Sequence, residues 1–258
     1  IFHTAAVTQV LDGLRDPKRC YETNILGTTN LLEAVRGSKK KVIFIFSSSD
    51  KAYGKLKTNN MYYENDKLLG DFTYDASKSA SDIISQSYSK TYDLNIGIIR
   101  SGNIFGPGDL NFERLIPGLA FNSLKNKKLN LRSNGKNRRD YIYVEDVVEG
   151  YEKLMKKMLL KKSGNIFIFN LGSNYNYSVV KVCRIFLNLI NKKNLQPIIK
   201  NNSKIEIPYQ KLNYKKVKKE LNWTPKTKFK TGLQKTYEWY NQNFKKISLV
   251  YKSLNIYK

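Results

Sequence analysis

The chain alternates between short apolar runs and longer stretches with helical periodicity. Each apolar run is hydrophobic at almost every position, which is typical of strands that are buried on both faces of a parallel sheet. The pattern therefore predicts an α/β fold in which helices cover a doubly wound parallel sheet. The predicted strands are residues 42–46, 96–99, 141–144 and 166–171. The predicted helices are residues 17–36, 74–92, 145–159, 178–189, 214–221 and 231–244.

Two local signals sharpen this pattern. Asp16 and Pro17 mark the start of the first predicted helix, because Asp is a common N-cap and Pro fits the first helical turn. Residues 102–109 read Gly-Asn-Ile-Phe-Gly-Pro-Gly-Asp, and this glycine and proline content predicts a loop directly after a strand. Open α/β sheets bind their ligands at such a place.

Length and charge narrow the class of protein. The 258 residues suit one large domain, or one domain with a smaller annex. The net charge of +25 invites a nucleic-acid interpretation. However, the excess is mostly Lys and is spread over the whole chain, and aromatic residues interleave with basic ones only around residues 209–219 and 237–246. We therefore interpret the charge as a compositional bias and expect no nucleic-acid partner.

The cysteines and the histidine carry little chemistry. Cys20 and Cys183 stand far apart in predicted helices, which argues against a disulfide framework or a zinc site and favours buried thiols in a reducing cytoplasm. His3 is the only histidine, so we expect a packed loop residue and no metal site. No apolar run approaches the roughly 20 residues of a membrane span, and no signal peptide opens the chain. We expect a cytoplasmic protein without a membrane partner.

Tyr74 and Lys78 are the most informative pair. They lie one helical turn apart, so the phenol and the ammonium share a helix face. The spacing Y-x-x-x-K recurs in this Tyr- and Lys-rich chain, but only Tyr74 follows an apolar strand that ends in hydroxyl groups and an acid, at residues 47–51. A nearby cation favours the phenolate, so we expect a lowered pKa for Tyr74 that lets it take a proton from a substrate hydroxyl. The hydroxyl of Ser49 could complete the relay.

One motif is absent. A dinucleotide site in this type of sheet needs a glycine-rich turn after the first strand, so that the backbone can approach the pyrophosphate. Neither G-x-G-x-x-G nor G-x-x-G-x-x-G occurs. Residues 1–6 are already strand-like and are followed by a helix, so we expect that the first strands of the fold are missing.

Taken together, these residues resemble the extended short-chain dehydrogenase/reductase family, and in particular its nucleotide-sugar dehydratases and epimerases. The resemblance spans nearly the whole chain and implies a Rossmann-like sheet, N-terminally truncated, with a smaller C-terminal α/β substrate-binding domain. It implies residues 1–172 as a partial NAD-binding domain, to which 105–139 add to the substrate side, and 173–258 as the small domain. The matching segments are residues 2–6, 21–28, 47–54, 74–78, 100–107, 139–147 and 221–225.

The resemblance implies NAD as cofactor and gives these positions roles. Tyr74 would deprotonate the sugar 4-hydroxyl while hydride leaves carbon 4, Lys78 would lower the pKa of Tyr74 and hold the nicotinamide ribose, and Ser49 would bind the same hydroxyl. The implied catalytic residues are Ser49, Asp50, Lys51, Tyr74 and Lys78. The implied cofactor-binding residues are Ala5, Ala6, Asn24, Ser47, Tyr74 and Lys78. The implied substrate-binding residues are Asn103, Arg114 and Arg139, with guanidinium groups suited to the nucleotide diphosphate.

Asp50 and Lys51 distinguish between reactions. Oxidation at carbon 4 acidifies the proton at carbon 5, so a 4,6-dehydratase needs a base for that proton and an acid for the departing 6-hydroxyl, whereas an epimerase needs neither. The Asp-Lys dipeptide resembles that of CDP-glucose 4,6-dehydratases. We therefore predict a nucleotide-sugar 4,6-dehydratase of the CDP-glucose or GDP-mannose type, with Asp50 as acid and with Lys51, if buried, as base or proton relay.

Other readings stay open. A 4-epimerase of the same family is the first alternative, and a catalytically silent or basic binding protein is the second. Without the glycine turn, we expect that the chain as it stands does not bind NAD tightly. It would then be either a fragment of a longer protein or a remnant without turnover. The resemblance also implies a homodimer that packs through the Tyr74 helix and a nucleotide-sugar substrate.

Overall fold

A four-stranded parallel sheet forms the centre of the larger part of the molecule. The computed structural model describes residues 1–55, 61–160, 164–202 and 206–253. The sheet has the strand order β1-β2-β3-β7, and all its pairs are parallel. The predicted α/β class is therefore confirmed.

The elements have the following bounds. The strands are β1 (Phe2–His3), β2 (Ile43–Ser49), β3 (Asn95–Ser101), β4 (Asn103–Phe105), β5 (Asn130–Leu131), β6 (Arg138–Tyr143), β7 (Ile166–Leu171), β8 (Asn176–Ser178) and β9 (Ile198–Ile199). The helices are α1 (Val10–Arg15), α2 (Pro17–Tyr21), the π-helix η1 (Glu22–Leu26), α3 (Gly27–Arg36), the 3₁₀ helix η2 (Asp50–Tyr53), α4 (Thr73–Tyr92), α5 (Leu115–Leu124), α6 (Val144–Leu159), α7 (Val179–Leu189), the 3₁₀ helix η3 (Lys193–Leu195), α8 (Lys215–Leu221) and α9 (Phe229–Ser253).

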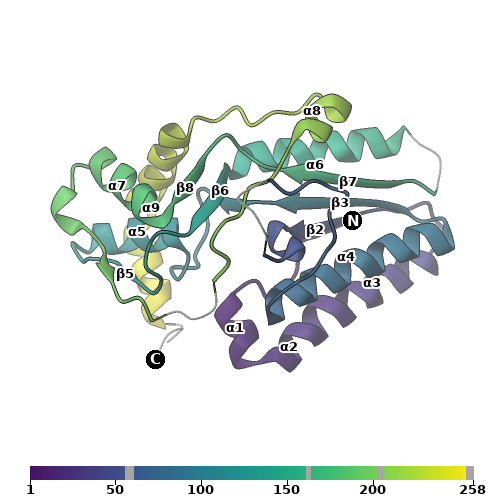
Figure 1. The fold of residues 1–258 in the computed structure, drawn as a ribbon, viewed down its shortest axis with the longest axis horizontal. Coiled ribbons are helices and arrows are strands. Elements are labelled where there is room, and N and C mark those ends of the chain that lie inside the picture. The colour runs from purple at the N-terminus through teal and green to yellow at the C-terminus, as the bar shows by residue number, and fades with distance from the viewer. Residues whose placement is uncertain (56–60, 161–163, 203–205, 254–258) are drawn as a thin grey trace.

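Helices cover both faces of this sheet (Figure 1). α4 packs on β2 and β3 with α3 beside it, and α6 and α8 lie on the opposite face. Phe44, Phe46 and Leu32 belong to the apolar core under α3 and α4. Trp223 belongs to the core under α6, with its indole N–H donating to the Asp146 carbonyl at 2.8 Å. Burial on both faces explains why the strands are apolar at successive positions.

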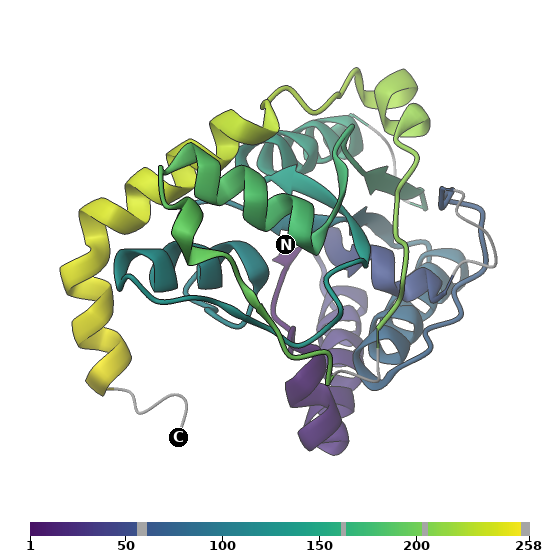
Figure 2. The same cartoon turned by 60° about the vertical axis from the view of Figure 1, so that its left-hand side comes forward.

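A smaller lobe lies beyond one end of the sheet, to the left in Figure 1. It contains a second sheet of order β4-β6-β8, packed with α5, α7 and α9 around an aromatic core that includes Phe105, Phe186 and Tyr240. Figure 2 shows the long helix α9 along the outside of this lobe. The strand predicted at 141–144 belongs here and not to the main sheet. The loop predicted at 102–109 contains β4, which pairs in parallel with β6.

Helix prediction succeeded where amphipathic periodicity was long. The Asp16 side chain accepts a hydrogen bond from the Arg19 amide at 2.9 Å, which confirms the predicted N-cap. Residues 17–36 are helical throughout but change to a π-turn at η1. α1 and α5 were not predicted, and α9 extends beyond the predicted helix at both ends.

The structure confirms the predicted burial of the two cysteines and, in part, the prediction for His3. Cys20 and Cys183 are buried free thiols in α2 and α7. His3 is buried but lies in β1 and not in a loop, with its Nε2 2.9 Å from the hydroxyl oxygen of Thr28. Within the described ranges, no helix is both long and apolar enough to cross a membrane. The predicted division at residue 172 stays a prediction.

The buried Arg100–Asp82 ion pair joins the elements around the end of β2. Arg100 is 1% exposed and donates from Nε and Nη2 to the two Asp82 oxygens, both at 2.9 Å. Asp82 also accepts from the Ser48 hydroxyl at 2.6 Å, and Arg100 donates to the Tyr53 hydroxyl at 2.9 Å. The Tyr53 hydroxyl in turn donates a hydrogen bond to Oδ1 of Asn170 in β7 at 2.7 Å. One ion pair therefore connects β2, β3, β7, η2 and α4.

Replacing Asp82 with alanine should lower the free energy of unfolding by about 3–5 kcal/mol, because it leaves the Arg100 guanidinium buried and unpaired. Chemical denaturation measures this loss. Lys18→Ala is the control, since Lys18 and Glu22 form an ion pair with side chains 84% and 54% exposed, and exposed pairs contribute less than about 1 kcal/mol. Equal losses for the two variants would contradict the prediction.

Candidate active site

The predicted catalytic segment lies where β2 ends at the carboxyl edge of the sheet. Residues 47–49 pair in register with 99–101 of β3. The helix η2 follows immediately and carries Asp50 and Lys51. Ser49 caps η2 by accepting a hydrogen bond from the Lys51 amide at 3.2 Å. The strand end and its cap therefore hold the two residues at the edge where open α/β sheets bind ligands.

Helix α4 presents Tyr74, Lys78 and Asp82 to this edge from successive turns of one face. The Ser79 hydroxyl donates to the Ala52 carbonyl at 2.6 Å and fastens α4 to η2. Because Asp82 is held by Arg100, the ion pair also sets the rotation of the helix that carries Tyr74.

The structure brings Tyr74 to Ser49 and Asp50, as predicted. Tyr74 is 8% exposed. Burial and the neighbouring Asp50 charge raise the pKa of Tyr74 well above its usual value, while a hydrogen bond with Ser49 and the charge of Arg114 act in the opposite direction. The expected lowering of this pKa is therefore wrong for the chain on its own, because burial of the phenol outweighs the Ser49 hydrogen bond and the Arg114 charge.

Lys78 is turned toward the end of β2. Its Nζ donates to the Ser47 carbonyl at 2.8 Å and lies 5.0 Å from the centroid of the Phe46 ring. Burial lowers the pKa of Lys78 to about 8, opposed by the charges of Asp82 and Cys20. A lysine ammonium carries three donors, and the Ser47 carbonyl engages one of them. Lys78 is thus a buried, partly satisfied donor next to the predicted base.

Asp50 has the properties of a proton donor. It is 3% exposed, its Oδ1 accepts from the Ser49 hydroxyl at 3.1 Å, and its Oδ2 has no hydrogen-bond partner within the described part of the chain. Burial raises the pKa of Asp50 against the charges of Lys51 and Arg139. Lys51 is only half-buried, so the structure does not show the enclosed ammonium that the sequence suggested.

Asp75 is the residue of this site that the sequence analysis missed. It is fully buried, and neither carboxylate oxygen has a hydrogen-bond partner among the described residues. Burial raises the pKa of Asp75 to about 6, and the Asp50 and Asp71 charges add to this rise, whereas Lys51 and Arg139 oppose it. The sequence feature that could have indicated Asp75 is an acidic residue directly after Tyr74. Its burial without a hydrogen-bond partner, however, is visible only in the structure.

Asn24 connects the predicted cofactor side to α4. Its Oδ1 accepts from the Val7 amide at 2.7 Å, and its Nδ2 donates to the Val7 carbonyl at 3.0 Å and to the Ser77 hydroxyl at 2.8 Å. These bonds fix the loop that contains Ala5, which is exposed, and Ala6, which is half-buried. Asn24 lies in the π-helix η1, and π-turns occur frequently at functional sites.

The predicted substrate-binding residues come from the smaller lobe. Asn103 is half-buried in β4, where it pairs with Tyr141 of β6. Arg139 is 7% exposed and is held by Glu206 at 2.7 Å and by the Ile207 carbonyl at 2.6 Å.

Arg114 reaches from the start of α5 to two neighbours. It donates to Asp109 at 2.9 Å and to the Thr8 hydroxyl at 3.0 Å, with its side chain 45% exposed. Arg114 therefore spans from the smaller lobe to the loop beside the sheet.

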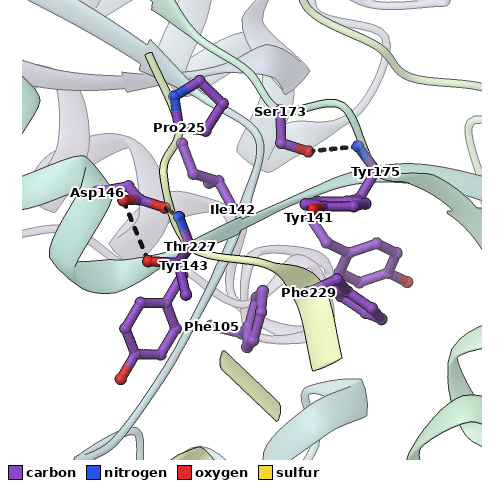
Figure 3. A pocket seen from close by; sticks show the side chains of 10 residues that line it. All are labelled: Phe105, Tyr141, Ile142, Tyr143, Asp146, Ser173, Tyr175, Pro225, Thr227 and Phe229. Atoms are coloured by element: carbon purple, nitrogen blue, oxygen red, sulfur yellow. Dashed lines mark hydrogen bonds between the residues drawn. The ribbon is translucent and has the colours of Figure 1, made fainter. Parts of the chain in front are cut away.

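Figure 3 shows a pocket lined mainly by residues of the smaller lobe. Its lining includes the rings of Phe105, Tyr141 and Phe229, and none of the predicted site residues belongs to it. Its acid, Asp146, already accepts hydrogen bonds from the Lys226 and Thr227 amides. The pocket is too narrow to admit a water molecule, and we regard it as a packing gap.

Sequence comparison decides the family. The family described as GDP-mannose 4,6 dehydratase matches residues 1–236. The chain belongs to the GDP-mannose 4,6-dehydratase family. As a member of this family, it has relatives that act on several nucleotide sugars. The human dTDP-D-glucose 4,6-dehydratase is 30% identical over 260 residues, which cover 98% of this chain and 72% of the relative.

One further relative is much longer than this chain, and two similar proteins have solved structures. A trifunctional UDP-glucose 4,6-dehydratase/UDP-4-keto-6-deoxy-D-glucose 3,5-epimerase/UDP-4-keto-L-rhamnose-reductase of Arabidopsis thaliana is 30% identical over 252 residues, 94% of this chain, and the chain spans 36% of its length. The dTDP-glucose 4,6-dehydratase of Bacillus anthracis, solved in complex with NAD, has a TM-score of 0.82 and 30% identity over 95% of this chain and 73% of that one. The UDP-glucose 4-epimerase of Thermotoga maritima, solved with UDP-glucose, has a TM-score of 0.84 and 27% identity over 94% and 77%.

The buried carboxyl of Asp75 should make stability depend on pH. Its pKa is about 6 in the folded chain against 3.8 as the usual value, so the folded state binds more protons between these values. Stability from this group is present below pH 4 and is lost as the pH rises through 6. Relative to Asp75→Asn, the wild-type free energy of unfolding should fall by about 3 kcal/mol across that window.

Denaturant unfolding at several pH values measures this difference. Asp93→Asn is the control, because Asp93 is exposed and its removal should leave the pH dependence close to that of the wild type. A wild-type curve parallel to that of Asp75→Asn between pH 4 and 7 would show that Asp75 is not held in this environment.

Proposed function

We propose that this protein is an NAD-dependent nucleotide-sugar 4,6-dehydratase. The observation that carries the proposal is Asp50, a buried carboxyl group with a raised pKa and one unpartnered oxygen, beside Ser49 and Tyr74. A protonated acid at this position is what the departure of the sugar 6-hydroxyl requires. The dehydratase relatives described above support the same reaction class.

Tyr74 and Ser49 would act in the first step, the oxidation of carbon 4. Both lie at the strand edge, so a sugar 4-hydroxyl placed there could contact the two oxygens together. Tyr74 would take the hydroxyl proton while hydride leaves carbon 4. The raised pKa of Tyr74 means that its phenolate needs additional positive charge.

The residues on the cofactor side fit NAD. Lys78 is buried and retains donors for ribose hydroxyls, and Asn24 fixes the loop with Ala5 and Ala6 beside α4. The Ser47 carbonyl orients Lys78. Lys78 and the loop fixed by Asn24 would hold NAD, which would supply the hydride acceptor and a positive charge for the reaction.

The second step is the loss of water across carbons 5 and 6. Asp50 would give its proton to the 6-hydroxyl as the carbon–oxygen bond breaks. Lys51, the next residue of η2, is the predicted base or relay for the carbon 5 proton. Asp50 and Lys51 lie side by side in η2 at one strand end, which supports their action on one pair of neighbouring substrate carbons.

Asn103, Arg114 and Arg139 would hold the nucleotide part of the substrate. Arg114 is accessible and already spans the two sides of the site, so it is the stronger candidate for the diphosphate. Arg139 would first have to release Glu206. The CDP or GDP nucleotide predicted from the sequence stays a prediction, and the relatives favour dTDP-glucose or UDP-glucose as the first substrates to test.

A 4-epimerase is the second candidate function. It is favoured by the similarity to the Thermotoga maritima UDP-glucose 4-epimerase and by the half-buried position of Lys51. An epimerase would use Tyr74, Lys78 and Ser49 in the same oxidation, and it would not need Asp50 as an acid.

The homodimer through α4 also belongs to this proposal. Ile83 on α4 and Leu26 in the neighbouring η1 are 52% and 55% exposed, and apolar residues on this face support a second copy as partner. The cytoplasmic location stays a prediction.

Tyr74→Phe should lower turnover of a nucleotide glucose by about 100-fold or more, because it removes the proton acceptor of the first step. Product formation by the full-length protein is the measurement. Tyr63→Phe is a matched control, since Tyr63 starts another Y-x-x-x-K sequence but is 50% exposed. Loss of activity in the control alone would overturn the assignment of Tyr74.

Asp50→Asn separates the two candidate functions. In a dehydratase it should reduce 4-keto-6-deoxy product by about 100-fold while the oxidation of carbon 4 continues, because the amide keeps the shape of the carboxyl but has no acidic proton. Mass spectrometry of the product and the absorbance of the reduced cofactor measure the two steps. A wild type that yields only the 4-epimer, with little effect of Asp50→Asn, supports the epimerase instead.

A further inference from the structure

Within the described part of the chain, the Asp75 carboxylate takes part in no hydrogen bond that would stabilise the fold. It is 0% exposed and both its oxygens lack a hydrogen-bond partner. An acidic residue in a first helical turn usually interacts with free backbone N–H groups or with solvent. Asp75 does neither, although a buried carboxyl group without a partner is costly. Such a group calls for an explanation outside the packing of the helix.

The backbone holds Asp75 firmly against η2. Gly70 packs so closely on the start of α4 that a Cβ at this position would lie 2.6 Å from the Ala76 Cα and 2.8 Å from the Asp75 carbonyl carbon. Ser79 binds the Ala52 carbonyl one turn further along. The first turn of α4 is therefore clamped between the segment before it and the helix that carries Asp50 and Lys51.

The charges that act on Asp75 come from η2, from the segment before α4 and from β6. Lys51 has the largest influence and Asp50 the next, both from η2. Asp71 acts from the preceding segment and Arg139 from β6. Of the two cations that act on Asp75, Arg139 is already paired with Glu206, which leaves Lys51.

The proposed dehydration requires a base for the carbon 5 proton, and the position of Asp75 bears on which group can be that base. The carbon 5 proton needs a base, and an ammonium group has no lone pair to accept a proton. Lys51 can act only after it gives up a proton to another group. Asp50 cannot be that group, because it must keep its own proton for the 6-hydroxyl.

We propose that Asp75 is the proton acceptor that makes Lys51 a base in the elimination step. This inference rests on the proposed dehydratase function. The Lys51 ammonium gives one proton to the Asp75 carboxylate, and the resulting amine takes the proton from carbon 5. Asp75 does not touch the substrate in this step and acts only through Lys51.

Lys51 and Asp75 return to their starting protonation states over one turnover. In the elimination, the carbon 5–hydrogen bond breaks, a nitrogen–hydrogen bond forms on Lys51, and Asp75 holds the proton that Lys51 released. Water leaves with the proton of Asp50. When hydride returns to carbon 6, Lys51 gives a proton back to carbon 5 and recovers one from Asp75. No additional oxidant or reductant is needed.

The test is a comparison of the two steps in the full-length protein with UDP-glucose and dTDP-glucose. Asp75→Asn should oxidise carbon 4 at close to the wild-type rate, seen as reduced cofactor in a single turnover. Solvent deuterium at carbon 5 and 4-keto-6-deoxy product should both fall by about 100-fold. Lys51→Met should match this loss, and the double variant should be no slower, because the two residues act as one unit.

Asp75→Glu is the conservative control and should recover part of the lost product, because it restores a carboxylate. The inference is overturned if Asp75→Asn forms product at the wild-type rate, or if oxidation of carbon 4 falls by the same factor as elimination. The second result would mean that Asp75 supports only the position of Tyr74. If the wild type yields a 4-epimer without keto product, the proposed function itself fails, and this outcome does not depend on any Asp75 variant.

Discussion

The Arg100–Asp82 ion pair is the constraint on which the site depends. Because Asp82 lies one turn after Lys78 and two turns after Tyr74, fixing Asp82 against β3 fixes the row of side chains that α4 directs to the sheet edge. The Ser48 hydroxyl joins the same carboxylate and thereby ties the end of β2 to the helix. A buried ion pair of this kind adds little net stability, but a single rotation of α4 satisfies all its donors. It therefore specifies geometry more than it supplies energy.

Burial dominates the electrostatics of the site. It raises the pKa values of Tyr74, Asp50 and Asp75 and lowers that of Lys78, so in each case it shifts the equilibrium toward the neutral form. The rise suits Asp50, which must be protonated to act as an acid, whereas a pKa of about 6 leaves Asp75 mostly ionised at pH 7. The rise does not suit Tyr74, whose phenolate requires positive charge beyond that of the chain itself. The spacing of Tyr74 and Lys78 showed that the two share a face, but not that burial would outweigh the Ser49 hydrogen bond and the Arg114 charge at the phenol.

The sequence predicted elements that have long periodic patterns and missed those defined by tertiary contacts. The apolar strands of the main sheet and the helix from Thr73 to Tyr92 follow from local composition. β4, β5 and β9 depend on partners that are distant in the chain, so no local pattern marks them. The residues around Tyr74 were predicted because strand end, hydroxyl and acid are contiguous in sequence. Asp75 was missed because its significance lies in being buried without a donor.

Ser49 connects the two halves of the proposed reaction. Tyr74 gains a proton when carbon 4 is oxidised, and Asp50 loses one when water departs, so a complete turnover must move one proton from the phenol to the carboxyl. Ser49 hydrogen-bonds Asp50 at 3.1 Å and also engages Tyr74. A hydroxyl can accept and donate at once, so this side chain provides a path for that proton without solvent. Ser49 would then serve both as the cap of η2 and as the proton path between Tyr74 and Asp50.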